Sequence, residues 1–410
     1  MFFSQINKLF RRVFYGKNIE TKKINLALLV CLVGFPQISE TIYTPSLTEI
    51  AKGYGVSLNL AQMTLSIYFL AFAVGVFFWG VSSDFLGRRK AMNFGIFIYI
   101  LGCFVCLFSN NITMLFIGRF VQAFGASTGS VTTQTILRDN YHGNDRHHLF
   151  SKISAALAFS PAIGPLIGGF IGQYYGFRVV FLFLVVMGMI LLFWSLKRLP
   201  ETKTVNATSF SVQKIVVTGK KMIFDRYTIA FGALIGIFNG ILFSYYSEAP
   251  TIFIERFHFN QSQYGFMGCA VATATILGAW LSNWRLKQNS PHKIIKEGIL
   301  LALIGTLFLS MVALFPLNIQ VIFYIFFISI ILVGIGMSLP NCLSLALVKF
   351  QEVAGTAGAF LSLGYYVIVS LCTFFIGVLH SGSMLVFPSF CLVLLLIALL
   401  CIKIATRNNR

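Results

Sequence analysis

Three ionisable side chains, Glu40, Arg119 and Glu248, lie within long apolar stretches of this 410-residue chain. A charge at membrane depth is costly unless it faces a partner or a water-filled cavity, so these positions are candidates for function. Glu40 and Arg119 lie at a similar depth. Burial disfavours a charged carboxylate and a nearby guanidinium favours it, so small changes around such a pair can switch proton binding. We hypothesise that Glu40 binds a proton and that Arg119 sets its affinity; the alternative is a static ion pair.

Glu248 repeats the pattern of Glu40 in the second half of the chain. Each glutamate follows a serine near the end of an apolar stretch and precedes a proline, Pro45 or Pro250, by a few residues. Glu248 lies closer to the surface than Glu40. Glu248 is therefore either a second residue that binds a proton or substrate, or a solvated acid. We include it with the proton-coupling residues.

Other polar and aromatic residues interrupt the apolar stretches and are candidates to line a substrate cavity, because an interior position keeps them out of lipid. Gln37 shares a helical face with Glu40, and Gln122 lies one helical turn from Arg119. The candidates are Gln37, Tyr43, Tyr68, Gln122, Gln134, Asn239, Tyr245, Tyr246, Asn341, Tyr365 and Tyr366. Aromatic walls suit amphipathic or cationic small molecules.

The other chemistry-bearing residues do not indicate an enzyme. The eight cysteines fall inside apolar stretches, where free cysteine usually behaves as a small hydrophobe, and the six histidines lie in or near the gaps. No phosphate-binding glycine loop that ends in Gly-Lys-Ser/Thr is present. We expect no metal and no cofactor, and the energy source that fits is a proton gradient.

Twelve apolar stretches must position these residues. Each approaches the ~20 residues that a helix needs to cross a bilayer. The stretches are continuous and not alternating, which predicts helices and excludes barrel strands. They cover residues 24–45, 62–81, 91–108, 112–137, 150–172, 179–196, 227–250, 264–283, 292–315, 319–342, 353–379 and 383–402. The fold class is therefore an all-α polytopic membrane protein with two six-helix bundles, residues 24–196 and 227–402.

The charge pattern predicts how the helices are oriented. The chain carries 31 basic and 12 acidic side chains, a net charge of +19, and the basic residues crowd into alternate gaps. Positive loops remain in the cytoplasm, which places residues 1–23, the linker 197–226 and the tail 403–410 there. The basic loops suit contact with anionic lipid, and we expect no nucleic-acid partner.

The gap between the second and third stretches carries the first of three motifs, Gly-Val-Ser-Ser-Asp-Phe-Leu-Gly-Arg-Arg-Lys. Gly80 and Gly87 allow a sharp turn, Asp84 can pair with a guanidinium, and Arg88 and Arg89 hold the loop on the cytoplasmic side. The motif indicates either a simple positive-inside turn or a latch between two helices that must move.

The other two motifs lie inside stretches. Arg119 belongs to Gly-Arg-Phe-Val-Gln-Ala-Phe-Gly-Ala, with small or polar residues at helical spacing. The third motif contains the tandem Gly164-Pro165 and Gly168-Gly169. Its small residues allow close helix packing in lipid, and the prolines kink the helix.

Together these motifs resemble the major facilitator superfamily. The first is similar to its helix 2–3 loop motif, the second to the helix 4 arginine motif of proton-coupled members, and the third to the helix 5 motif of proton-driven exporters. Arg138-Asp139-Asn140-Tyr141 and Tyr43-Thr44-Pro45-Ser46-Leu47 resemble segments of the Bcr/CflA drug-resistance branch. That branch often carries an aspartate two residues before this tyrosine, whereas here Thr41 holds that place and Glu40 precedes it.

The resemblance implies a monomeric drug:proton antiporter in the bacterial inner membrane that exports small, amphipathic molecules by alternating access. A dedicated exporter of one metabolite, such as a siderophore, is the alternative, because Arg119 and the positive charge would tolerate an anionic cargo. A proton-coupled importer fits the glycine and proline motif of helix 5 less well.

Overall fold

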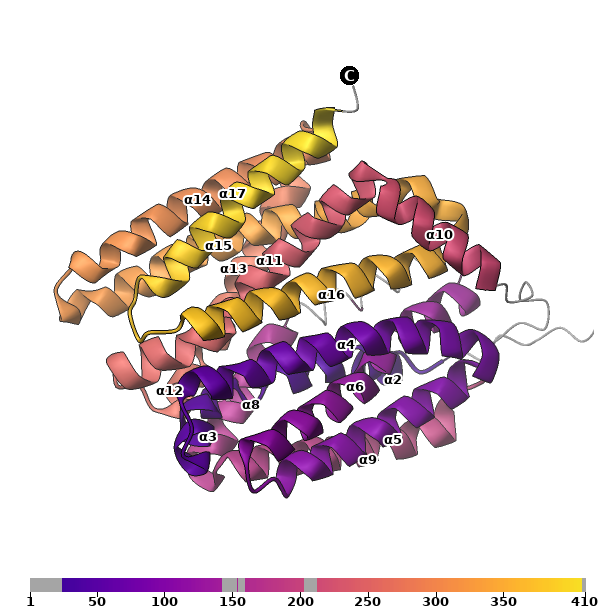
Figure 1. The fold of residues 1–410 in the computed structure, drawn as a ribbon, viewed down its shortest axis with the longest axis horizontal. Coiled ribbons are helices and arrows are strands. Elements are labelled where there is room, and N and C mark those ends of the chain that lie inside the picture. The colour runs from indigo at the N-terminus through magenta and orange to yellow at the C-terminus, as the bar shows by residue number, and fades with distance from the viewer. Residues whose placement is uncertain (1–23, 142–152, 154–158, 203–211, 408–410) are drawn as a thin grey trace, which may run out of the picture.

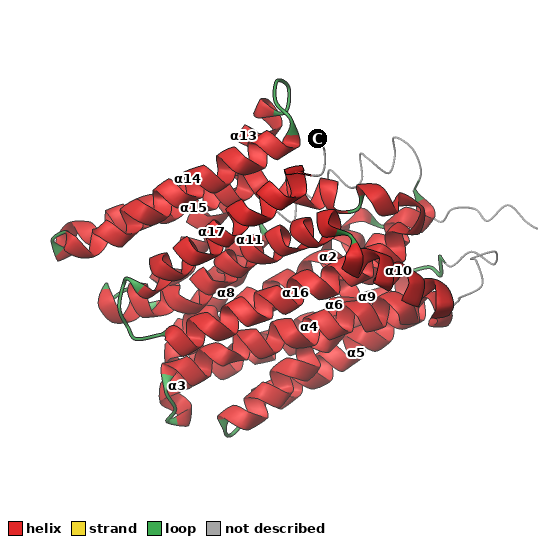
Figure 2. Cartoon of the chain, turned by 45° about the horizontal axis from the view of Figure 1, so that its top comes forward, coloured by secondary structure: helices red, strands yellow, loops and turns green. Residues whose placement is uncertain are grey.

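The computed structural model describes residues 24–141, 153, 159–202 and 212–407, and within these ranges every regular element is helical (Figures 1 and 2). Ten helical segments are long and apolar enough to cross a membrane. Their main helices are α2 (Leu26–Thr41), α4 (Leu58–Leu86), α5 (Arg88–Leu107), α9 (Phe177–Arg198), α11 (Arg226–Pro250), α13 (Met267–Arg285), α14 (Pro291–Met311), α15 (Leu317–Ala346), α16 (Ala354–Leu379) and α17 (Val386–Arg407). Two further helices, α6 (Ile112–Asn140) and α8 (Ser160–Tyr175), match the remaining predicted stretches. The predicted all-α membrane fold is confirmed.

Shorter helices connect these elements. They are η1 (Thr44–Ser46), α3 (Leu47–Tyr54), α10 (Val212–Phe224), η2 (Thr251–Arg256), α12 (Gln261–Gly265), η3 (Val312–Leu314) and η4 (Val348–Val353). The sequence analysis did not anticipate α10, which lies in the predicted linker. We call the end of the molecule with α10 and the α4–α5 turn the basic end, and the end with α3 and α12 the opposite end (Figure 1).

Side-chain caps and glycine turns fix the helix ends. Ser57, Asn111 and Asp225 each accept a hydrogen bond from a backbone amide in the first turn of α4, α6 and α11, as expected of N-cap residues. Gly87, between α4 and α5, and Gly176, between α8 and α9, have φ values of 88° and 80°. Only glycine adopts this region readily, so these two turns need the residues they have.

Glycines also set the closest helix contacts, and they do so at equivalent places in the two halves. A Cβ at Gly102 or Gly125 would collide with backbone atoms of the facing helix in the α5–α6 pair. A Cβ at Gly298 or Gly334 would do the same in the α14–α15 pair. Both pairs are the third and fourth helices of their half. Small residues drive such packing in lipid, where apolar contact alone gives no advantage.

The two halves, α2–α9 and α11–α17, meet along two seams. α4 packs along α16, and the two helices lie side by side in both ribbon views (Figures 1 and 2). α8 packs against α12 and α13 at the opposite end. The interface between the halves is therefore built mainly from α4, α8, α11, α12, α13 and α16.

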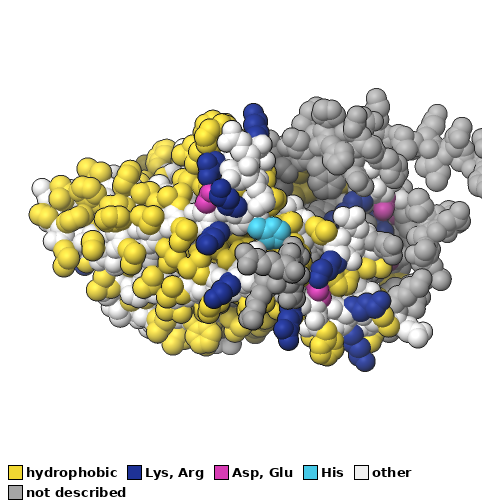
Figure 3. Space-filling model, turned by 90° about the horizontal axis from the view of Figure 1, so that it is seen from above, with side chains coloured by type: hydrophobic (Ala, Val, Ile, Leu, Met, Phe, Trp, Pro, Cys, Tyr) yellow, Lys and Arg dark blue, Asp and Glu magenta, His cyan; other side chains and the backbone are white. Residues whose placement is uncertain are grey.

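The outer surface is apolar where a bilayer would contact it. Leu300, Ile304, Leu396 and Leu400, on α14 and α17, are all exposed. Figure 3 shows hydrophobic side chains over the part of this face that lies toward the opposite end, while Lys and Arg gather in its middle and toward the basic end. An exposed apolar surface this extensive is typical of a lipid-facing surface.

The α5–α6 contact yields a stability prediction. Gly125→Leu places its side chain against the backbone of Tyr99 and Gly95, and overpacking of this kind costs roughly 1–3 kcal/mol. Gly364→Leu is the matched control, because nothing lies within 4 Å of a Cβ at that exposed position of α16. We expect a lower thermal unfolding midpoint in detergent for the first variant only; equal midpoints would contradict this packing.

Candidate functional site

Arg119 is fully buried in the first half and lies between two tyrosine rings. Its guanidinium carbon is 4.0 Å from the centroid of the Tyr43 ring and 4.2 Å from that of Tyr68. Tyr43 shares a hydrogen bond of 3.0 Å with Thr64, and the hydroxyl of Tyr68 donates to the carbonyl of Pro36 at 3.4 Å. Two aromatic faces therefore replace part of the hydration that the cation loses.

The edge of the guanidinium makes few hydrogen bonds. Nη1 donates to Oε1 of Gln122 at 2.6 Å and to the carbonyl of Ser39 at 3.3 Å. Gln122 in turn donates to the sulfur of Cys103 at 3.1 Å. Nε and Nη2 of Arg119 have no hydrogen-bond partner among the described residues. Two donors of a fixed, buried cation are thus available to a carboxylate, a carbonyl or water.

Glu40 lies next to this arginine but does not contact it directly. The residue is 7% exposed, and in the part of the chain that the structure describes its carboxylate forms no ion pair within 4.0 Å. The direct pair with Arg119 that the sequence allowed is therefore not formed. The guanidinium instead lies between the two tyrosine rings and donates to Gln122 and Ser39. The two charges still interact at longer range.

Glu40 faces the boundary between the halves. Its charge interacts with Tyr68 in the first half and with Tyr246, Tyr365 and Tyr366 in the second. Tyr366 also stands 4.7 Å, centroid to centroid, from the ring of Phe72. A titratable group thus lies where the two halves must separate if they move.

The glycines of the third motif connect the helix of Glu40 to the second half. A Cβ at Gly164 would collide with the hydroxyl of Thr41, and one at Gly168 with the carbonyl of Ile42. A Cβ at Gly169 would collide with the carbonyl of Gln261 in α12. Helix α8, which includes Pro165, therefore contacts α2 on one face and the second half on another, so a shift of α2 is transmitted across the boundary.

The opposite end is closed by hydrogen bonds between α4 and the second half. Nε2 of Gln62 donates to Oε1 of Glu248 at 3.0 Å and to the carbonyl of Ser247 at 2.9 Å. Nδ1 of His380 lies 2.8 and 3.0 Å from the two carboxylate oxygens of Glu248. Glu248 is 2% exposed, so it is not the solvated acid that the sequence left open. Sequence reasoning missed His380, because it follows α16 in a connecting segment.

A cavity of about 550 Å³ lies between the halves toward the basic end. Gln134, Arg138, Ser344, Ser362 and Tyr365 contribute its polar lining, and Val33, Val76 and Leu361 are among its apolar residues. Gln134 and Tyr365 are thus placed as predicted. Its size matches that of small-molecule sites.

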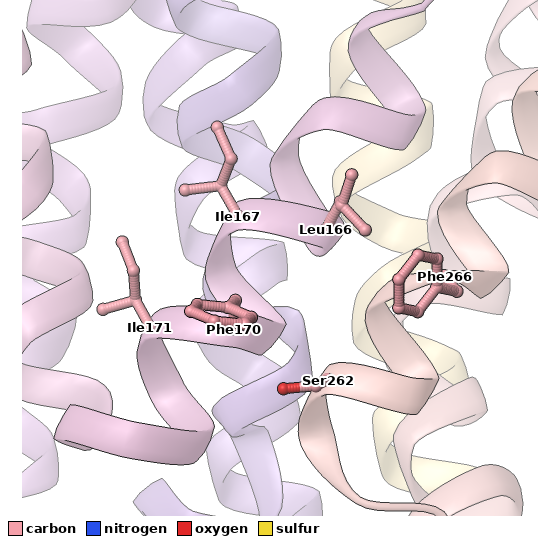
Figure 4. Close-up of a pocket in the computed structure, with 6 residues that line it drawn as sticks. All are labelled: Leu166, Ile167, Phe170, Ile171, Ser262 and Phe266. Atoms are coloured by element: carbon pink, nitrogen blue, oxygen red, sulfur yellow. The ribbon is translucent and has the colours of Figure 1, made fainter.

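A smaller pocket of about 280 Å³ lies at the seam between α8 and the second half (Figure 4). Leu166, Ile167, Phe170, Ile171 and Phe266 line it together with Ser262. With no ionisable group in its lining, this pocket suits lipid contact and not proton chemistry.

The structure places other predicted lining residues away from the cavity. Asn341 donates to Ser282 at 2.7 Å inside the second half, and Tyr245 packs against Phe387 there. Asn239 donates to the carbonyl of Ile235 in its own helix at 2.9 Å. Gln37 is half-buried on α2. The amides of Asn341 and Asn239 thus bond within one bundle.

The first motif forms a latch of four segments at the basic end. Arg88, at the start of α5, pairs with Asp84 of α4 and, at 3.0 Å, with Asp139 of α6. A Cβ at Gly80 would stand 3.4 Å from Val131 and 3.5 Å from Ala359, so α4 lies close to both α6 and α16 here. The motif residues thus join three helices of the first half and lie beside α16 of the second.

Glu201 completes the latch, although the sequence analysis did not single it out. Its carboxylate accepts hydrogen bonds from the backbone amides of Arg88 and Arg89 at 2.8 and 3.3 Å. The guanidinium of Arg89 donates to the carbonyl of Leu196. A Cβ at Gly87 would collide with Glu201. The chain after α9 thereby caps the positive N-terminal end of α5.

Two ion pairs hold the basic end of the second half. Arg285 of α13 pairs with Glu297 of α14 at 2.7 Å, and Lys349 of η4 pairs with Asp225 at 2.7 Å. Burial opposes ionisation of Asp225, but the hydrogen bonds from Lys349 and Thr228 outweigh it and lower the pKa of that carboxyl. Across the described ranges no three His, Cys, Asp or Glu side chains gather as a metal site would require.

Comparison with known proteins agrees with this geometry. The family model of the Major Facilitator Superfamily matches residues 29–373. A Rickettsia felis protein named "Uncharacterized transporter" is 35% identical over 387 residues, 91% of this chain and 94% of that protein. "Multidrug resistance protein D" of Escherichia coli strain K12 is 26% identical over 347 residues, 82% of this chain and 84% of that one.

A solved structure supports the fold alone. The D-xylose-proton symporter superposes with a TM-score of 0.73 over 91% of this chain and 96% of its own, at 15% identity. The predicted resemblance is confirmed at the level of the superfamily, and the relative named for multidrug resistance is consistent with a drug:proton antiporter branch.

The cap on α5 can be tested by hydrogen exchange. Glu201→Gln removes the negative charge at the start of this helix, an interaction worth ~1 kcal/mol, so we expect the amides of Arg88 and Arg89 to exchange about fivefold faster. Glu255→Gln, at an exposed position of the opposite end, is the control. Unchanged exchange in the first variant would show that Glu201 does not stabilise α5.

Proposed function

This chain belongs to the Major Facilitator Superfamily and is therefore a membrane transporter and not an enzyme, and we propose that it exports small molecules in exchange for protons. The observation that carries the proposal is the arrangement of Arg119 and Glu40. A fixed, buried cation lies beside a buried carboxylate that faces the boundary between the halves. Burial and the cation act on the carboxylate in opposite directions, so a change in hydration switches its proton.

The positive-inside rule places the basic end in the cytoplasm of a bacterial plasma membrane, with both termini on that side. In this orientation the 550 Å³ cavity lies toward the cytoplasm and the hydrogen-bonded end lies outside. Substrate enters the cavity while Glu40 is deprotonated. When the closed and open ends exchange, substrate leaves and Glu40 takes up a proton from outside. The protonated carrier then reopens toward the cytoplasm, where Glu40 releases the proton and the first state is restored.

Aromatic contacts across the boundary support an amphipathic substrate. Phe69 of α4 lies 4.3 Å from Phe243 of α11, and Phe72 lies 4.7 Å from Tyr366 of α16, measured between ring centroids. These rings must part when the halves separate, and a flat apolar substrate can replace the contacts that they lose. The relative named for multidrug resistance is consistent with such a substrate.

One observation favours a second candidate, a dedicated exporter of an anionic metabolite such as a siderophore. Nε and Nη2 of Arg119 lack partners among the described residues, and Arg138 lines the cavity. A guanidinium with two donors in one plane suits a carboxylate or a hydroxamate. The two candidates share the proton mechanism and differ in cargo.

Inside-out vesicles that contain the protein test the function. We expect an imposed pH gradient, acid inside, to drive accumulation of a lipophilic cationic dye, because outward export becomes uptake in this orientation. An uncoupler abolishes the gradient and should abolish accumulation. Accumulation of a trihydroxamate instead of the dye would favour the second candidate. Accumulation that is indifferent to the uncoupler would refute proton coupling, and substrate loss would indicate an importer.

The role of Glu40 can be separated from substrate binding. Glu40→Gln keeps the shape of the side chain but cannot release a proton, so we expect proton-driven accumulation to fall by an order of magnitude or more. Exchange of labelled for unlabelled substrate without a gradient should persist. Glu255→Gln, at an exposed position, should retain both activities. Normal proton-driven accumulation in Glu40→Gln would remove Glu40 from the mechanism.

A further inference from the structure

A second ionisable pair lies far along the chain from Glu40 and Arg119, at the opposite end. Glu248 of α11 and His380, which follows α16, both belong to the second half, and Gln62 of α4 reaches them from the first. The side chains of His380 and Glu248 are 8% and 2% exposed. The contact is thus a buried, titratable hydrogen-bond network that spans the boundary between the halves.

Among the described groups around Glu248, His380 is the one that can carry a positive charge. α4 contributes the uncharged Gln62, α16 leads into His380, and α15 places Tyr324 within electrostatic range of the carboxylate without a hydrogen bond to it among the described residues. Within the described ranges, no lysine or arginine forms an ion pair with Glu248. With a neutral imidazole and an ionised carboxylate, the closed network carries one negative charge. One further proton bound to the pair makes the network neutral.

We propose that Glu248 and His380 form a proton-binding site that locks the opposite end when it is occupied. Without the extra proton, the closed state buries a carboxylate that has no cation, and such burial is unfavourable. With the proton, the closed state holds a neutral, hydrogen-bonded pair. In the open state water solvates both groups. The closed state therefore binds the proton more tightly, and by linkage acid must favour closure.

The backbone around His380 ties this site to the seam. Nδ2 of Asn59 donates to the carbonyls of Gly377 and His380 at 2.9 and 3.0 Å. Further along the same helix pair, the hydroxyl of Ser370 in α16 donates to the carbonyl of Ser66 in α4 at 2.8 Å. A displacement of His380 therefore pulls on the same helix pair, α4 and α16, that closes this end.

The inference uses the alternating access of the proposed function but not the role of Glu40. Spin labels at Lys52→Cys and Ser381→Cys, two exposed positions on the two halves near the opposite end, report its opening. Replacing the exposed Cys31 and Cys269 by alanine limits labelling elsewhere. Distance distributions are measured by electron–electron double resonance on the full chain in nanodiscs between pH 8 and pH 5.5.

We expect the short-distance, closed population of the otherwise unmodified protein to grow on acidification, by at most about tenfold per pH unit, the limit for one linked proton. Glu248→Gln should lose this response, because no carboxylate remains for a proton to neutralise in the closed state. His380→Gln should change the pH at which the response occurs, because the proton must then bind the carboxylate itself. Gln62→Leu should shift the distribution toward open and keep the response. Glu255→Gln should match the parent.

Glu40→Gln separates this inference from the proposed function. If the opposite end senses protons through His380 and Glu248, this variant keeps the acid response even though its proton-driven transport is lost. A response that persists in Glu248→Gln, or that keeps its midpoint pH in His380→Gln, overturns the lock. If the acid response fails these tests of the lock and is absent from Glu40→Gln, the conformational equilibrium depends on Glu40 alone. The proposed function then stands without the lock.

Discussion

The cost of burying Arg119 is the constraint on which the centre of this molecule depends. A guanidinium in an apolar bundle needs partners, and here rings from α2–η1 and α4, an amide from α6 and a backbone carbonyl from α2 supply them. Each partner fixes the helix that carries it. Three helices are therefore held in register by one side chain, and Glu40 lies beside it because it follows Ser39, whose carbonyl Arg119 binds.

A continuous set of contacts leads from this charge to the boundary between the halves. Ser39 and Glu40 are followed by Thr41 and Ile42, against which the glycines of α8 pack without room for a side chain. The other face of α8 contacts Gln261 in the second half. The contacts of Gly168 and Gly169 are with backbone carbonyls, so rotamer changes cannot absorb them. In the mechanism that we propose, a shift of α2 would therefore move whole helices, which is what coupling between distant sites requires.

The helices could be predicted because their length and apolarity are local properties of the chain, and the charges at membrane depth could be found for the same reason. The direction in which each polar side chain points could not be predicted from the sequence. Asn341 and Tyr245 interrupt apolar stretches as Tyr365 does, yet Asn341 donates to Ser282 and Tyr245 packs against Phe387 inside one bundle. His380 and Glu248 are 132 residues apart and Glu201 lies 113 residues from Arg88, so only tertiary packing brings them together.

The two ends of the molecule are held by different kinds of contact, and the difference fits a carrier. At the basic end, ion pairs such as Arg88–Asp139 and Arg285–Glu297 join helices within one half, so they hold each bundle rigid. At the opposite end, the contacts between the halves include hydrogen bonds of Asn59, Gln62 and Ser66, worth ~0.5–3 kcal/mol net each, the upper values applying to a bond with a charged group. Rigid bundles joined by weak contacts move as bodies, and the lock that we propose at Glu248 and His380 would act on these contacts between the halves.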